Sequence, residues 1–66
     1  MQELIIGLTY LMEENDRYGK DYLTKMIIND YNEVFVKYTV IGEESDYTRY
    51  TRTANFNKLY TIVCTL

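Results

Sequence analysis

The sequence has no histidine, no proline and no tryptophan, and it has only one cysteine and three glycines among its 66 residues. Without histidine, a serine–histidine catalytic triad, an imidazole metal ligand and the usual base for neutral pH are all excluded. A single cysteine, Cys64, cannot form an intramolecular disulfide, so we expect a cytoplasmic rather than an oxidising compartment. With so little proline and glycine, the turns must be made mainly by Asn, Asp and Ser.

The size and charge of the chain limit the classes of protein that remain. Sixty-six residues form one domain, residues 1–66, near the lower limit for a single apolar core, which favours self-association as a homodimer. Hydrophobic residues make up 47% of the chain, as in ordinary folded proteins, but no apolar run is long enough to span a bilayer. The net charge of −3 disfavours direct nucleic-acid or membrane binding and favours a basic protein partner.

Five segments have the composition of β-strands and are separated by turn-forming stretches: 3–12, 22–28, 34–41, 47–53 and 59–66. In the third segment every second residue is apolar on one side, with Val34, Val36, Tyr38 and Val40. In the last segment the more apolar face holds Tyr60, Ile62, Cys64 and Leu66. This pattern predicts an all-β fold, a five-stranded antiparallel meander that is half-closed or a small barrel, with the last strand pairing with the first or with another copy.

The second segment also allows an α+β alternative, with one helix over 16–29 packed on a four-stranded sheet. Apolar residues recur there at helical spacing: Tyr18, Tyr22, Leu23, Met26, Ile27 and Tyr31. Against the helix, Gly19 lies in its interior and the neighbouring residues are mediocre helix formers. Segments 30–39 and 55–64 also resemble each other, each with an aromatic residue among asparagines, which suggests a hairpin unit used twice with a turn at 53–57.

Two acidic stretches, 13–18 and 42–46, lie in the first and third predicted connections, which a meander places at the same end of the sheet. Eight tyrosines are too many for so small a core, so some should lie on a contact surface beside the acidic stretches. The predicted partner-binding residues are Glu13, Glu14, Asp16, Tyr18, Glu43, Glu44, Asp46, Tyr47 and Tyr50. Such a patch would dock onto the basic surface of a nucleic-acid-handling protein, although acidic turns also serve solubility alone.

A second candidate site is the stretch 47–53, which interleaves tyrosines with arginines. Tyr47, Arg49, Tyr50 and Arg52 could stack a base and hold a phosphate, as single-strand and nucleotide binders do. Tyrosine and threonine are also simply good strand formers, and two arginines give a small phosphate footprint. A third interpretation is a structural subunit of a homo-oligomer that pairs through its last strand.

Catalysis, cofactors and metals find no support in the sequence. Neither acidic stretch has the ligand spacing of an EF-hand, and there is no zinc-ligand spacing or phosphate-binding glycine loop. We therefore predict a non-enzymatic binding protein without cofactor. Its small, acidic, tyrosine-rich character is typical of phage or mobile-element proteins that inhibit a host nucleic-acid-processing protein, for example a defence nuclease.

Overall fold

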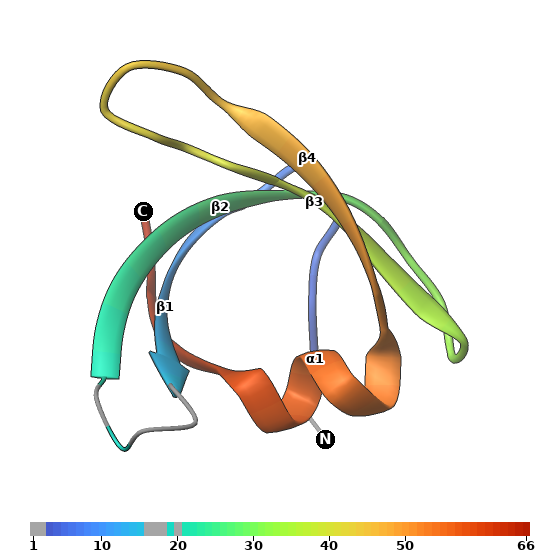
Figure 1. The fold of residues 1–66 in the computed structure, drawn as a ribbon. Coiled ribbons are helices and arrows are strands. Elements are labelled where there is room, and N and C mark those ends of the chain that lie inside the picture. Colours follow the sequence, from blue (N-terminus) through green and yellow to red (C-terminus); the bar gives the residue numbers. More distant parts are fainter. Residues whose placement is uncertain (1–2, 16–18, 20) are drawn as a thin grey trace.

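The computed structural model describes residues 3–15, 19 and 21–66. In chain order its elements are β1 (Thr9–Asn15), β2 (Asp21–Tyr31), β3 (Phe35–Val40), β4 (Tyr47–Arg52), α1 (Thr53–Leu59) and β5 (Tyr60–Thr65) (Figure 1). The strands form one sheet in the order β4-β3-β2-β1-β5, and every neighbouring pair is antiparallel. The prediction of a five-stranded antiparallel sheet is confirmed, with β5 pairing with β1 and the sheet remaining open between β4 and β5.

The short helix α1 explains how the last strand reaches the far edge. Because β1 to β4 are successive hairpin partners, β4 runs in the same direction as β2. β5 is antiparallel to β1 and lies at the opposite edge of the sheet from β4. β4 and β5 are the two edge strands, and α1 joins them by crossing one end of the curled sheet (Figure 1). The expectation of a turn at 53–57 is therefore wrong.

Packing rather than helix propensity explains α1. Its sequence, TANFNKL, contains two asparagines and a threonine, which are weak helix formers. Its Phe56 is completely buried, with ring centroids 5.2 Å from Tyr38 and 4.9 Å from Tyr60. The start of the helix is tied to the β2–β3 turn, where the Thr53 hydroxyl donates to the Asn32 carbonyl oxygen at 2.7 Å. These tertiary contacts hold a helix that would not form alone.

The core fills the concave face of the sheet under α1. It consists of Leu4, Tyr10, Met12, Met26, Ile28, Val36, Tyr38, Val40, Phe56 and Tyr60. The alternation predicted for 34–41 is confirmed for Val36, Tyr38 and Val40, whereas Val34 lies before the strand and is exposed. Met26 and Ile28 alternate in the same way on β2, so the alternative helix over 16–29 is wrong. In a strand, hydrogen bonds to neighbouring strands satisfy the backbone N–H and C=O groups that a helix would satisfy by its own hydrogen bonds.

A bulge in β5 reverses the face of its last residues. Met12 pairs with Ile62 but Leu11 pairs with Cys64, so Val63 is an extra residue on β5. Tyr60 is buried and Ile62 packs against the core, but Cys64 is exposed. The prediction that Cys64 shares the apolar face of Tyr60 is wrong, because a one-residue shift moves a side chain to the opposite face.

Candidate functional site

The acidic residues of the first predicted stretch do not share one surface. Glu13 and Glu14 lie within β1, which extends further than predicted, and successive strand residues point to opposite faces. Glu13 is exposed on the convex face, opposite Leu23. Glu14 is half-buried on the concave face, where its Oε2 accepts a hydrogen bond from the Thr24 hydroxyl at 3.2 Å. Asp16 and Tyr18 lie outside the described residues.

The second acidic stretch forms the connection of the β3–β4 hairpin. Glu43, Glu44 and Asp46 are all exposed there, and the connection projects away from α1 and the core (Figure 1). The Gly42 amide donates to Asp46 Oδ1 at 3.2 Å. Gly42 also approaches the Ser45 carbonyl oxygen so closely that a Cβ atom would overlap with it. The loop is thus closed by its own contacts, and it presents three carboxylates together.

Tyrosines and arginines alternate on β4 beside this loop. Tyr47 and Arg49 lie on the concave face, opposite Val40 and Tyr38, while Tyr50 and Arg52 lie on the convex face. The guanidinium carbon of Arg49 is 4.9 Å from the centroid of the Tyr47 ring, a cation–π geometry. The four residues proposed to bind a nucleotide are therefore divided between two faces, and one ligand could meet only the pair Tyr47 and Arg49 on the concave side.

The concave face of β4 is polar and is connected to the core by hydrogen bonds. The Tyr38 hydroxyl lies 3.0 Å from Thr51 Oγ1 and 3.3 Å from the Tyr60 hydroxyl. Burial, the hydrogen bond with Tyr38 and the nearby Glu14 carboxylate raise the pKa of Tyr60 well above its usual value. Partial burial lowers the pKa of Arg49, but the neighbouring tyrosine oxygens outweigh this and raise it on balance. At neutral pH both groups therefore keep their protons.

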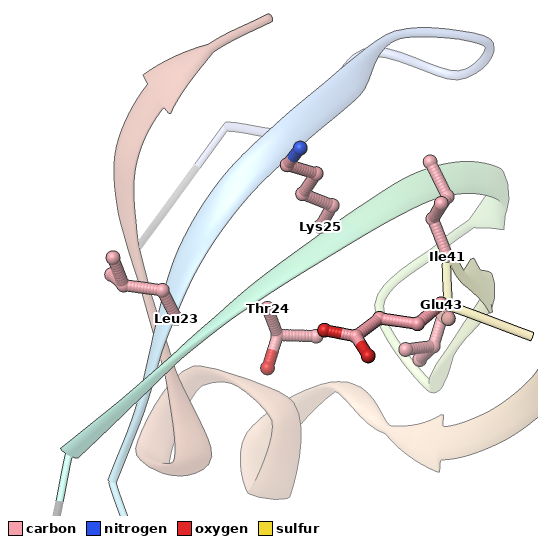
Figure 2. Close-up of a pocket in the computed structure, with 7 residues that line it drawn as sticks. Leu23, Thr24, Lys25, Ile41 and Glu43 are labelled. Carbon is pink, nitrogen blue, oxygen red and sulfur yellow. The ribbon is translucent and has the colours of Figure 1, made fainter.

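A pocket of about 460 Å³ lies where β2 and β3 part (Figure 2). Its lining residues are Leu23, Thr24, Lys25, Val40, Ile41, Gly42 and Glu43. In Figure 2 the Glu43 carboxylate points toward Thr24, whereas Lys25 and Ile41 point to the other side. Glu43 alone among these residues was predicted as a site residue. The others were missed because the pocket arises from unequal strand lengths, which composition does not reveal.

The chain matches no protein-family model, no curated protein and no solved structure. Within residues 3–15, 19 and 21–66, no three carboxylate or thiol groups gather as they would around a metal ion. None of the helical structure in that part of the chain is long and apolar enough to cross a membrane. The geometry of the hairpin and its pocket is the basis for the functional proposal.

Proposed function

We propose that this protein is a non-enzymatic binding protein of the cytoplasm, which docks its β3–β4 hairpin onto the basic surface of a nucleic-acid-handling protein and inhibits or modulates it. One observation carries this proposal: Glu43, Glu44 and Asp46 project together from one short loop, Tyr47 is exposed directly after it, and Tyr50 is exposed on the other face of β4. Three carboxylates on one short loop can occupy positions that phosphates would take on the partner.

The hairpin is suited to binding because much of it is ordered in advance. The bond from the Gly42 amide to Asp46 restrains the loop, and the contact with Arg49 restrains the Tyr47 ring. A restrained loop loses less conformational entropy on binding, which favours affinity. Tyrosine adds a large contact area at small entropic cost. The net charge of −3 adds long-range attraction to a basic partner, so the association should weaken as salt rises.

The test compares two variants that each remove three negative charges. E43Q/E44Q/D46N neutralises the loop, and the D46N change keeps a side-chain oxygen that can accept the Gly42 hydrogen bond. The matched control, E3Q/D30N/E33Q, neutralises three exposed carboxylates elsewhere, and its D30N change keeps the acceptor for the Tyr31 amide. Each tagged protein is incubated with nuclease-treated bacterial lysate at low and high salt, and bound proteins are identified by mass spectrometry.

We expect a nucleic-acid-binding protein to be retained by the wild type and the control, to be lost from the loop variant, and to be released by salt or by added duplex DNA. Equal retention by the loop variant would exclude the loop carboxylates as the binding determinant. The duplex DNA arm tests whether the protein covers a nucleic-acid site, because a partner bound elsewhere would stay on the resin.

A second candidate function, nucleotide binding, draws on the stacked pair Tyr47 and Arg49 on the concave face. A base or sugar could lie against the tyrosine while the guanidinium holds one phosphate. Analysis of the small molecules released from the same purified protein tests this function. A recovered nucleotide that is absent from the Arg49→Ala variant would favour it over protein binding.

A further inference from the structure

The pairing between β2 and β3 ends before β2 does. β2 has 11 residues and β3 has 6, and the last backbone bond between them runs from the Ile41 amide to the Lys25 carbonyl oxygen, at 2.9 Å. β2 continues to Asp21 with β1 on its other side. Among the described residues, no strand pairs with 21–24 on the side that β3 has left. This part of β2 is an unpaired strand edge inside the sheet.

The direction of the backbone groups on this edge follows from antiparallel geometry. The amide and carbonyl of one residue point to the same side of the strand, and the side alternates from residue to residue. Because the Lys25 carbonyl faces β3, the backbone groups of Leu23 face the same way, into the space between β2 and the hairpin loop. The pocket of about 460 Å³ occupies this space. An unpaired edge with an adjoining space is the geometry in which an extended peptide adds as a strand.

The two sides of the pocket differ in chemistry. On the convex side Leu23, 68% exposed, and Ile41 offer apolar surface, together with the stem of Lys25. On the concave side the Glu43 carboxylate points toward Thr24, whose hydroxyl is hydrogen-bonded to Glu14 (Figure 2). A strand in the pocket would place successive side chains on opposite sides. The convex side fits an apolar side chain, and the concave side fits a lysine or arginine that meets the Glu43 carboxylate.

We propose that residues 21–25 of β2 and the pocket bind an extended peptide segment of the partner, in which a basic residue is next to an apolar one, by strand addition. This inference rests on the proposed function, since the partner is the one that the hairpin binds. The occupant is set by charge complementarity with Glu43, and by the apolar surface of Leu23 and Ile41. The segment lies between β2 and the hairpin loop and extends the sheet.

The test is an NMR titration of the full ¹⁵N-labelled chain with synthetic peptides. The probe is acetyl-Val-Lys-Val-Lys-Val-Lys-amide, and its partner probe has Glu in place of Lys. We expect saturable shifts confined to residues 21–25 and 40–43 with the lysine peptide and none with the glutamate peptide. Two further peptides are N-methylated, one at the valines and one at the lysines. Only one of these sets of amides faces β2, so one methylated peptide should lose at least about tenfold in affinity and the other should retain it.

Protein variants complete the test. E43Q should weaken the lysine peptide about tenfold, the effect of one charge-assisted hydrogen bond, while E33Q at the opposite end of β3 should leave its affinity unchanged. Binding that is insensitive to both N-methylated peptides, equal binding of the glutamate peptide, or no binding at millimolar concentration would each overturn strand addition.

The failure of this inference and the failure of the proposed function are distinguishable. E44Q/D46N leaves every residue that lines the pocket intact, so it should weaken capture of the protein partner without changing the affinity for the lysine peptide. Capture that depends on the loop carboxylates, without peptide binding, would overturn strand addition alone. Peptide binding together with unchanged capture by E43Q/E44Q/D46N would support the peptide site and overturn the proposed docking of the hairpin loop.

Discussion

The hydroxyl oxygens of Tyr38 and Tyr60 lie 3.3 Å apart in the core, although these residues are on strands that are not neighbours. β2 and β1 lie between β3 and β5, which in a flat sheet would be about 14 Å apart. The sheet curls strongly (Figure 1), and the two side chains meet across its concave face. The contact links β3 to β5 across a sheet that backbone hydrogen bonds do not close into a barrel.

The first prediction concerns this contact. Tyr60→Phe removes the hydroxyl that lies 3.3 Å from the Tyr38 hydroxyl, and Tyr38 keeps its contact with Thr51. We expect the free energy of unfolding to fall by about 1 kcal/mol, the usual net contribution of one hydrogen bond. Urea denaturation measures this loss. Tyr50→Phe, at a position that is 66% exposed, is the control and should change stability little. If the two variants behave alike, the hydroxyl contact does not stabilise the fold.

The second prediction is a loss of stability in alkali that depends on Tyr60. The pKa of Tyr60 is raised in the folded state by burial, by the hydrogen bond with Tyr38 and by the Glu14 carboxylate. Above the unfolded pKa of about 10, the unfolded chain releases this proton while the folded chain keeps it. The contribution of Tyr60 to the free energy of unfolding is therefore fully present below pH 10. Between pH 10 and the pKa of Tyr60 in the folded state, it falls by about 1.4 kcal/mol per pH unit.

Comparing unfolding of the wild type and of Tyr60→Phe at several pH values between 8 and 11 isolates this effect, because the two proteins differ by this one hydroxyl. We expect the wild-type curve to be steeper above pH 10, so that the difference between the two proteins shrinks or reverses. Parallel curves would mean that the pKa of Tyr60 is the same in the folded and unfolded chains.

The sequence predicted those parts of the fold that depend on short-range pattern. Val36, Tyr38 and Val40 alternate with polar or aromatic neighbours, and this alternation indicates a strand with one buried face. Helix α1 could not be predicted in the same way, because its asparagines and threonine are typical of turns. Its conformation depends on Phe56 packing against residues on β3 and β5 and on the need to join the two edge strands of the sheet. Both causes exist only in the assembled sheet.

The candidate site was predictable to the extent that it lies in a loop. Carboxylates between two strands indicate an exposed connection, and Glu43, Glu44 and Asp46 lie in one. Glu13 and Glu14 differ because β1 extends through them to Asn15, so the sheet separates them to opposite faces. The pocket was not predictable, since it depends on where pairing between β2 and β3 stops.

The third prediction tests whether α1 supports the core. Phe56→Ala removes a side chain that is completely buried against Tyr38 and Tyr60, so we expect a loss of about 3–5 kcal/mol, enough to unfold much of so small a protein. Asn55→Ala is the control in the same helix. Asn55 is exposed, and alanine is the better helix former, so this variant should be unchanged or more stable by up to about 0.7 kcal/mol. Circular dichroism melting curves measure both. A Phe56→Ala variant as stable as the wild type would contradict the packing of this helix on the sheet.

The last prediction concerns the shape of the hairpin loop. A side chain at Gly42 would overlap with the Ser45 carbonyl oxygen, which is backbone and cannot rotate away alone. Gly42→Ala must therefore open the loop and weaken the bond from its amide to Asp46, at a cost of about 1–3 kcal/mol in stability. Glu44→Ala, which changes an exposed side chain in the same loop, should cost less than about 0.5 kcal/mol. Because Gly42→Ala opens the loop, we expect its amide chemical shifts to change across residues 41–46, and not only at the immediate neighbours of position 42. The affected residues include Glu43, which lines the pocket. Shifts limited to those neighbours, with wild-type stability, would mean that the loop does not need a glycine at this position.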